Sequence, residues 1–470
     1  MQSDTTRNSR KRKMSGERRE ALARMTKRKS WVVVLLAAGL LIAIPLPALA
    51  HGLGGRSDLP VPLGYAVAGA LTVLVLTFVA LVRLWPEPRM QEPPVLRPIR
   101  FPGWRLVAVA LRGLGISVLV VLVATGLFGA DNSVRNPAPV LMWVGFWLLV
   151  PFASAAVGDL YRLTNPWDLL VKGGSAPQRV WPPSLGVWPA LVLFVAFVWI
   201  ELIYPRAADP VAVAAVVLVF GLLMVLSADR WEGGLDGFDP FRTYNGLVSS
   251  LAPIQLSEET PQWRGWLRAL PLLPARPGLT AFVITTIATV TYDGLSATGW
   301  YDRTFGSFGG SMTGSSLLLM ATGSLLAVAY TGACWAAARQ ARGRWTTSIV
   351  AQRFAHTLVP IAFAYAFAHY FTLVVFEGQL LLSTLSDPFG RGWNLLGTTG
   401  RSVDFTLLSP YAIWWVQVAV IVVGHVAGVV LAHDRALLDF PTDTSVRSQY
   451  VMLALMVLLT TLGLVILSAS

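Results

Sequence analysis

Four of the chain's five histidines lie in two hydrophobic segments near its C-terminus. His356 and His369 belong to the run RFAHTLVPIAFAYAFAHYFTLVVF, and His425 and His433 belong to VVGHVAGVVLAHDRAL. An ionisable ring inside a bilayer is costly, so it normally faces the interior of a helix bundle and binds a metal, a cofactor, a proton or another polar group. These histidines therefore mark a candidate site, whose chemistry depends on the elements that position them.

The composition indicates that these elements belong to an integral membrane protein. The 470-residue chain is 54% hydrophobic and only 13% charged, which is far too apolar for an ordinary soluble domain. Its net charge of +12 is concentrated in the N-terminal tail and in short loops between apolar runs. That distribution indicates membrane orientation rather than nucleic-acid binding. The single cysteine, Cys334, lies in an apolar run and is expected to be a buried helix residue without a disulfide.

The N-terminal region has the order of a secretory signal. Residues 1–30 form a basic tail, which we expect in the cytoplasm, and residues 31–50 follow as WVVVLLAAGLLIAIPLPALA. A basic region, an apolar region and small residues at its end are typical of a signal peptide, and cleavage after Ala50 would leave His51 as the new N-terminus. The alternative is an uncleaved signal anchor, because the apolar stretch is nearly long enough to span. In both cases residue 51 is expected outside, and residues 51–470 form a single transmembrane helical domain.

Ten further apolar segments are each long enough to cross about 30 Å of hydrocarbon as a helix. Runs this apolar satisfy their backbone groups only as helices, so the sequence predicts an all-α polytopic bundle. The arginines fall mainly in every second loop, which places the 233–275 and 338–346 loops in the cytoplasm. The longer loops mix apolar and polar residues with Pro and Gly, and we expect them to form interfacial half-helices. The predicted spans are 63–84, 105–128, 138–158, 186–204, 211–228, 278–298, 315–337, 347–376, 409–432 and 448–468.

This topology assigns a depth in the membrane to each histidine. The segment of His356 runs outward, so His369 lies about 20 Å further out at 1.5 Å per residue. The next segment runs back inward, which places His425 near the depth of His356 and His433 at the inner end. A GxxxG pattern brackets His425 and permits close helix contact. We therefore predict that His356 and His425 approach each other across the interface between their helices.

Polar residues from other segments join His369 near the outer face. Asp293, in TVTYDGLSATGW, lies a turn or two from the outer end of its helix, His51 is also outside, and Glu377 and Asp58 lie at the rim. Two imidazoles, a carboxylate and a free amine are suitable ligands for Zn²⁺ or Cu²⁺, and a bound metal can turn water into hydroxide at neutral pH. The sequence thus predicts a divalent-metal site formed by His51, His369 and Asp293, with Asp293 or Glu377 as the proton acceptor.

Each candidate residue also has a purely structural interpretation. His369 and His425 are compatible with hydrogen bonds across helices, Asp293 with a helix cap, and His433 with an interfacial position. His356 stands four positions before a proline, where a freed backbone carbonyl needs compensation. A haem b held by His356 and His425 is a further alternative. Nucleophile-elbow, phosphate-loop, CxxC and CxxCH patterns are absent, so a serine hydrolase, a P-loop ATPase and a thiol redox protein are unsupported.

Four segments resemble those of the fenitrothion hydrolase-like family of polytopic membrane proteins. They are HGLGGRSDLPVP, DPFRTYNGLVSSLAP, TYDGLS and RFAHTLVPIAFAYAFAHYFTLVVFEGQ, and they follow in order over most of the chain from His51 onward. The resemblance implies hydrolysis of an aryl organophosphorothioate ester with release of a nitrophenol, and it supplies no catalytic residues. Combined with the metal site above, it leads to a hypothesis in which a small apolar phosphotriester partitions into the bilayer and a metal-bound hydroxide attacks its phosphorus.

Two other classes of protein remain compatible with this pattern. A metal or proton transporter would need a polar path between the outer and inner histidines, and the intervening TLVPIAFAYAF offers only Thr357 and Tyr365. A haem-binding electron-transfer subunit would be coloured as purified. The lipid bilayer is the one partner that the sequence defines.

Overall fold

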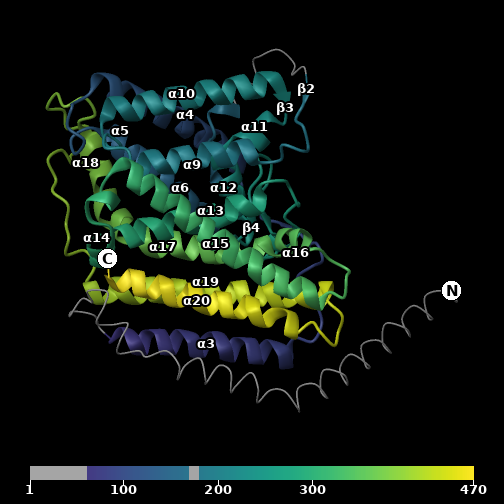
Figure 1. Cartoon of the computed structure of the whole chain (residues 1–470). Coiled ribbons are helices and arrows are strands. Elements are labelled where there is room, and N and C mark those ends of the chain that lie inside the picture. The colour runs from purple at the N-terminus through teal and green to yellow at the C-terminus, as the bar shows by residue number, and fades with distance from the viewer. Residues whose placement is uncertain (1–60, 169–178, 470) are drawn as a thin grey trace.

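The chain folds as a bundle of long helices that lie side by side (Figure 1). The computed structural model describes residues 61–168 and 179–469. Within these residues, nine helices are long and apolar enough to cross a membrane, and α9 is a shorter apolar helix. The predicted fold class, an all-α polytopic membrane bundle, is confirmed. The uninterrupted long helices are α3 (Leu63–Leu84), α4 (Trp104–Phe128), α10 (Pro210–Arg230), α13 (Leu279–Ser296), α15 (Met312–Gln340), α19 (Pro410–Asp439) and α20 (Tyr450–Ala469), the last preceded by the 3₁₀ turn η5 (Arg447–Gln449).

Two spans change helix type along their length. The proline at position 360 explains one of these changes, because its ring clashes with the carbonyl of residue 356 in an α-helix and it has no N–H to donate. The helix therefore tightens into a 3₁₀ turn before the proline. This span consists of α16 (Thr347–Phe354), η3 (Ala355–Leu358), α17 (Val359–Phe376), η4 (Glu377–Gln379) and α18 (Leu380–Ser386). The other span consists of α5 (Pro137–Val140), the π-helix η1 (Leu141–Leu149) and α6 (Val150–Val157).

Shorter elements connect the spans or pack between them. At 1.5 Å per residue, α9 (Trp188–Leu202) rises only about 22 Å. The other short helices are α7 (Leu160–Thr164), α11 (Gly234–Phe238), α12 (Pro240–Ser249), η2 (Leu270–Leu272) and α14 (Gly299–Gly309). The strands β1 (Arg97–Pro98), β5 (Gln262–Trp263) and β4 (Ile254–Gln255) form an antiparallel sheet in the order β1-β5-β4, and β2 (Arg179–Val180) pairs in parallel with β3 (Trp231–Glu232).

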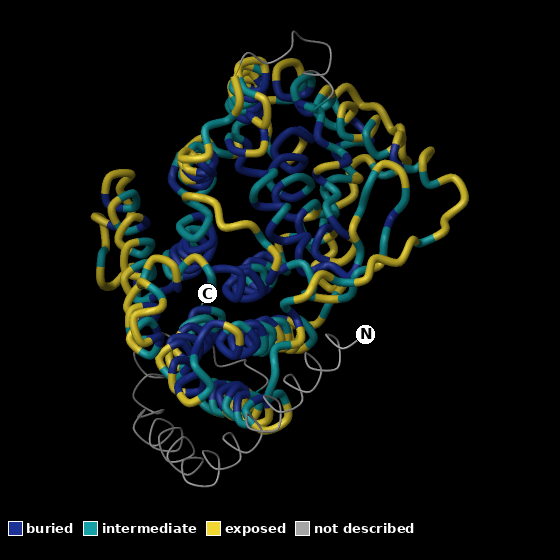
Figure 2. Tube along the Cα trace, turned by 90° about the vertical axis from the view of Figure 1, so that its right-hand side faces the viewer, coloured by how far each residue is buried: buried dark blue, intermediate teal, exposed yellow. Residues whose placement is uncertain are grey.

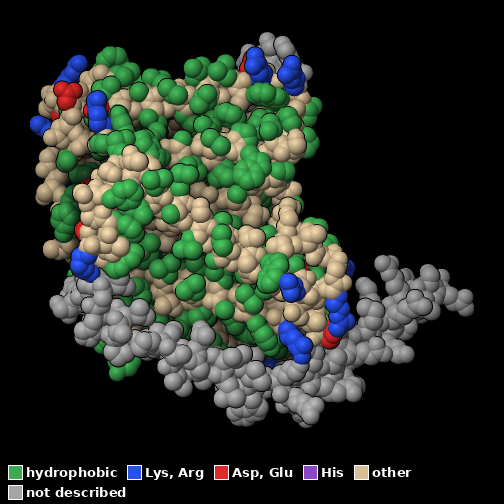
Figure 3. Space-filling view, viewed as in Figure 1, with side chains coloured by type: hydrophobic (Ala, Val, Ile, Leu, Met, Phe, Trp, Pro, Cys, Tyr) green, Lys and Arg blue, Asp and Glu red, His purple; other side chains and the backbone are tan. Residues whose placement is uncertain are grey.

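Apolar side chains cover the sides of the bundle. In Figure 3 the middle of the visible face is mostly hydrophobic, whereas charged side chains lie near its edges. Leu76, Val109 and Leu218, on three of the long helices, are 61%, 63% and 49% exposed. Figure 2 shows that the buried residues gather toward the inside of the bundle. Soluble proteins rarely expose a continuous apolar surface of this kind, so a lipid bilayer is the environment that it fits.

Helix α12 is buried among the other helices of the bundle. It belongs to the segment DPFRTYNGLVSS, for which the sequence predicts an interfacial half-helix. Phe241, Tyr244 and Asn245 are buried, and both aromatic rings pack on Trp147 of η1. The Asp239 side chain accepts hydrogen bonds from the first backbone N–H groups of the helix and caps it. The polar residues of this segment thus serve the interior of the protein.

Helices α17 and α19 approach closely because α19 presents glycines to its neighbour. A Cβ atom on Gly424 would lie 2.4 Å from the Ala364 side chain and 2.7 Å from the carbonyl oxygen of Pro360. On Gly428 it would lie 2.9 Å from the carbonyl oxygen of Thr357. The GxxxG pattern therefore brings the two backbones together, as the sequence predicts. This pair of helices and the η3 turn carry the four C-terminal histidines.

Candidate functional site

An Asp–His pair joins α13 to α17 at the end of the bundle that carries α14 and α18. One carboxylate oxygen of Asp293, Oδ2, lies 2.8 Å from Nε2 of His369. The hydroxyl of Tyr370 donates a hydrogen bond to the same oxygen at 2.8 Å. Both members of the pair are partly buried, with 23% of the Asp293 side chain and 20% of the His369 side chain exposed. The sequence predicts that these two residues share a depth, and the structure brings them into direct contact.

Glycines allow α20 to pack closely against this pair. A Cβ atom on Gly294, the residue after the aspartate, would lie 2.4 Å from the Ile466 side chain and 3.6 Å from Nδ1 of His369. A Cβ atom on Gly463 would lie 2.7 Å from the ring of Tyr365. Any larger residue at these positions would push α20 away. The small residues therefore set how closely the three helices surround the histidine.

His369 also lines a small cavity between α13, α17 and α20. The cavity has a volume of about 30 Å³ and is bordered by Thr291 and Tyr365, among other residues. An ionised carboxylate only accepts hydrogen bonds, so Asp293 places the ring proton on Nε2 and leaves Nδ1 as an acceptor. Within the described residues, Nδ1 makes no hydrogen bond. A cavity of this size holds one water molecule, and the site therefore offers a basic nitrogen beside a water-sized space.

A second carboxylate, Glu201 at the end of α9, lies near the pair, and the sequence alone does not single it out. Its charge interacts with Asp293, and with the hydroxyls of Tyr370 and Tyr244. The indole of Trp147 lies beside it, yet Nε1 of that indole and Oε2 of Glu201 are both buried without a well-formed hydrogen bond to the described residues. The signal for Glu201 in the sequence is a lone carboxylate in the apolar run FVWIELIYP.

The predicted metal site is only partly within the described structure. Its first ligand, His51, lies outside the described residues, as does Asp58. Among the residues that are described, no three His, Cys, Asp or Glu side chains are arranged to hold a metal ion. Asp293 and His369 therefore do not form a metal site without further ligands. A Zn²⁺ or Cu²⁺ ion bound by these two residues and His51 stays a prediction.

Glu377, the alternative proton acceptor, lies apart from the pair. It opens the 3₁₀ turn η4, eight residues and thus about two helical turns after His369. Within the described residues it makes no hydrogen bond or ion pair with Asp293 or His369. Tyr370 and Glu201 take the nearby positions instead. No contact in the described structure supports the predicted catalytic role of Glu377.

The inner histidines have separate surroundings. His425 is fully buried, with its ring 5.5 Å from that of Tyr365. His433 is also buried rather than interfacial, and its ring nitrogens lie 3.0 Å from Oε1 of Gln449 and from the carbonyl oxygen of Trp85. The contacts of His433 connect α19 to η5 and to the end of α3. The sequence is compatible with hydrogen bonds across helices for His425, but Nδ1 of that ring lies 2.8 Å from the carbonyl oxygen of Ile421 in its own helix.

His356 and His425 both face the protein, but the described structure shows no ring contact between them. His356 is 5% exposed and lines a cavity with Arg353 and Arg435. The Nε2 atoms of His356 and His425 are both buried without a hydrogen-bond partner in the described part of the chain. A haem b bound by the two rings stays a prediction.

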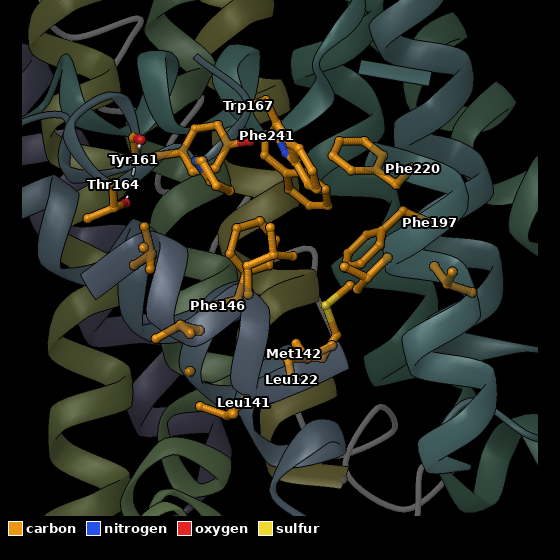
Figure 4. A pocket seen from close by; sticks show the side chains of 18 of the residues that line it. Leu122, Leu141, Met142, Phe146, Tyr161, Thr164, Trp167, Phe197, Phe220 and Phe241 are labelled. Atoms are coloured by element: carbon orange, nitrogen blue, oxygen red, sulfur yellow. Dashed lines mark hydrogen bonds between the residues drawn. The ribbon is translucent and has the colours of Figure 1, made fainter. Parts of the chain in front are cut away.

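A large apolar cavity lies between α4, η1, α9 and α10 (Figure 4). Its volume is about 790 Å³, within the range of small-molecule pockets. Figure 4 shows Phe146, Trp167 and Phe197 around the open space, and almost all of the other lining side chains are aliphatic or aromatic. Ile200 lines the cavity and directly precedes Glu201. The wall of the cavity and the polar cluster around the Asp–His pair thus meet on α9.

A polar network borders this cavity. Tyr161, one of the lining residues, donates its hydroxyl to Oδ2 of Asp239 at 2.8 Å. Burial raises the pKa of Asp239 to about 6, although hydrogen bonds from Tyr161 and from backbone N–H groups oppose the change. Arg242 forms ion pairs with Asp168 and Asp236, at 3.1 Å and 2.9 Å. These contacts fix α7 and α11 on α12 and give the region a carboxyl group that titrates near pH 6.

Fold and site together describe a polytopic α-helical membrane protein with an Asp–His pair inside the bundle. Comparisons with models of protein families, with curated proteins and with solved structures gave no match. The resemblance to fenitrothion hydrolase-like proteins therefore rests on the four quoted segments. Two of these segments, TYDGLS and RFAHTLVPIAFAYAFAHYFTLVVFEGQ, contain Asp293 and His369.

Proposed function

We propose that the chain is a membrane-embedded hydrolase that cleaves an apolar organophosphorus ester, with the Asp293–His369 pair as its general base. The observation that carries the proposal is the placement of His369, which is bonded to Asp293 through Nε2 at 2.8 Å and borders a water-sized cavity. An imidazole oriented by a carboxylate can accept a proton from water while that water attacks the substrate. Both residues lie in segments that resemble the fenitrothion hydrolase-like family.

In the proposed reaction, Nδ1 of His369 takes a proton from water as the water oxygen forms a bond to phosphorus. The bond between phosphorus and the aryl oxygen breaks, and the aryloxide leaves with the electron pair. The imidazolium gives its proton to the aryloxide, which forms a phenol, and the phosphodiester product ionises. Asp293 balances the charge of the imidazolium, and the Tyr370 hydroxyl holds the carboxylate in place.

The proposed substrate class follows from the surroundings of the pair. A phosphotriester carries no charge and partitions into the bilayer, and the apolar cavity of about 790 Å³ is large enough for its aryl group and ester chains. We propose that the substrate reaches the polar cluster along α9, where Ile200 and Glu201 are adjacent. A divalent metal would add Lewis-acid catalysis if His51 completed the site.

Turnover of an aryl phosphotriester by purified protein tests the proposal. We expect Asp293→Asn and His369→Gln each to lower the rate by about 10²–10⁴-fold, the usual contribution of a general base. The matched control is Asp302→Asn, which changes an exposed aspartate in α14 at the same end of the bundle. Absence of turnover by the wild-type protein, or full activity of both site variants, would overturn the hydrolase.

A chelator separates the two forms of this mechanism. Turnover that survives chelation supports the Asp–His pair acting on water alone. Loss of turnover that added Zn²⁺ or Cu²⁺ restores supports a metal held with His51. In the second case His51→Ala should abolish both the restored activity and the bound metal, which elemental analysis measures independently.

A further inference from the structure

We propose that a second cavity, at the end of the bundle that carries α16, binds a phosphate group through Arg353, Arg435 and His356. The cavity has a volume of about 260 Å³ and lies between η2, α13, α16, η3 and α19. Apolar residues such as Leu279 and Val283 form the rest of its wall. Two guanidinium groups and an imidazole therefore share one space inside an otherwise apolar part of the bundle.

Two polar atoms at the cavity have no hydrogen-bond partner among the described residues. Nε2 of His356 is buried without a hydrogen-bond partner among the described residues, although the side chain is only 5% exposed. Nε of Arg435 is also buried without a hydrogen-bond partner among the described residues. Nη2 of the same side chain donates to the carbonyl oxygen of Pro271 at 2.8 Å. Unsatisfied buried groups of this kind are costly. A hydrogen phosphate would satisfy both at once, because its oxygens can accept from Arg435 and its P–O–H group can donate to the imidazole nitrogen.

The charges around the cavity favour an anion. Arg353 binds Asp439 with two hydrogen bonds, and Asp439 is also the carboxylate that interacts most strongly with Arg435. The neighbouring Asp434 points to the end of α3 instead, where it accepts hydrogen bonds from backbone N–H groups and from the Trp85 indole. Arg353 is thus paired with Asp439, whereas Arg435 forms no ion pair within the described residues and feels the charges of Asp439 and Asp434 only from a distance. A guanidinium group without an ion pair at the cavity favours an oxyanion over a metal ion.

Phosphate is the oxyanion that this donor set fits best. Guanidinium groups form forked hydrogen bonds with phosphate, and the hydroxyl group of a hydrogen phosphate can donate to Nε2 of the imidazole. The cavity holds a phosphate group together with a few waters, since each water occupies about 30 Å³. A free phosphate and the phosphate of a lipid headgroup share this chemistry. The site is separate from the Asp–His pair, because His356 and His369 are 13 residues apart, about 20 Å along a helix.

Titration of the purified protein with inorganic phosphate tests the site by calorimetry. We expect saturable binding by the wild-type protein, and binding weakened at least about tenfold in Arg435→Gln and in His356→Phe, because each removes a group that forms a hydrogen bond with the charged ligand. Arg344→Gln is the matched control, since Arg344 lies at the same end of the bundle and packs on Trp345 outside the cavity. Equal affinity in the wild-type protein and both site variants would overturn the proposal.

A second binding experiment, with a lipid, identifies the source of the phosphate group. Native mass spectrometry with added phosphatidic acid should show retention by the wild-type protein and loss in Arg435→Gln if the ligand is a headgroup, even where free phosphate does not bind. Binding of neither probe by the wild-type protein would overturn the site. His356→Phe keeps an aromatic ring of similar size, so its thermal midpoint without ligand shows whether the fold survives the change.

Discussion

Asp293 and Glu201 are two carboxylates in one region of the bundle, and they have opposite surroundings. Asp293 accepts hydrogen bonds from His369 and Tyr370, both at 2.8 Å, so its charge is compensated. Oε2 of Glu201 is buried without a partner in the described structure, and the charge of Asp293 acts on it from nearby. A carboxylate in such a position is costly unless it holds a proton or a cation. We therefore expect different roles for the two residues: in the proposed mechanism Asp293 orients a base, whereas Glu201 holds a proton.

Replacing Glu201 tests this assignment. Glu201→Gln should leave the thermal midpoint within a few degrees of the wild-type value, since Gln is uncharged and close in shape to a protonated carboxyl group. The matched control is Glu377→Gln, which changes a carboxylate in η4 without contact to the pair. Thermal unfolding in detergent measures both variants. A large fall in the midpoint of Glu201→Gln would instead mean that the carboxylate binds a cation or donates a needed hydrogen bond.

At the scale of helices, glycine positions determine how closely the site can be enclosed. Gly294 and Gly463 bring α20 against His369 and Tyr365, and Gly424 brings α19 against α17. Packing of helices in lipid depends on such close approach, because no hydrophobic effect drives one apolar helix against another. The geometry of the Asp–His pair therefore depends on residues that have no chemistry of their own.

Alanine at two glycines in long helices should have opposite effects. Gly424→Ala should destabilise the protein by about 1–3 kcal/mol through overpacking, because the new Cβ atom would lie 2.4 Å from the Ala364 side chain. Gly332→Ala in α15 should stabilise it by up to about 1 kcal/mol through helix propensity, since nothing lies within 4 Å of its Cβ position. Chemical or thermal unfolding compares the two. Equal effects would mean that α17 and α19 do not pack at Gly424.

Asp239, which caps α12, should make stability depend on pH. Its pKa is raised from the ordinary 3.8 to about 6, so the folded state holds the proton more tightly than the unfolded state. The stabilisation is complete below about pH 4 and is lost as the pH rises through about 6, by about 3 kcal/mol in total. Asp239→Asn should remove this slope while it keeps the cap. Thermal midpoints between pH 4 and 8 measure it, with Asp302→Asn as the control that keeps the slope.

The sequence predicts the elements better than the contacts between them. Length and hydropathy locate most of the long helices to within a few residues, although α19 continues to Asp439, beyond the predicted end at 432, and the proline at position 360 accounts for the 3₁₀ turn that holds His356. The direction of each side chain is not predictable, because uniformly apolar segments have no periodicity to orient them. The sequence thus gives Asp293 and His369 the same depth, but not the roles of Glu201 and Tyr370. The sequence does not predict the burial of α12 either, since its mixed composition is also typical of an interfacial helix.

At the scale of the whole molecule, the apolar sides and charged ends of the bundle fit a bilayer in either direction (Figure 3). The orientation of the bundle in the membrane determines which side of the membrane each site faces. The Asp–His pair lies at the end with α14 and α18, and the phosphate cavity lies at the end with α16. The distribution of arginines predicts that the first of these ends faces outward. A substrate from outside would then reach the pair, and cytoplasmic phosphate or an inner-leaflet lipid would reach the cavity.

Cysteine labelling in intact cells determines this orientation. We expect an impermeant maleimide to label Arg391→Cys, between α18 and α19, and to label Arg342→Cys, between α15 and α16, only after the membrane is permeabilised. Both arginines are exposed, and the native Cys334 is fully buried, so the unmodified chain provides a low background. Labelling of position 342 from outside would mean that the bundle has the opposite orientation in the membrane. The Asp–His pair would then act on substrates from the cytoplasm, and the metal site with His51 would lose its expected location.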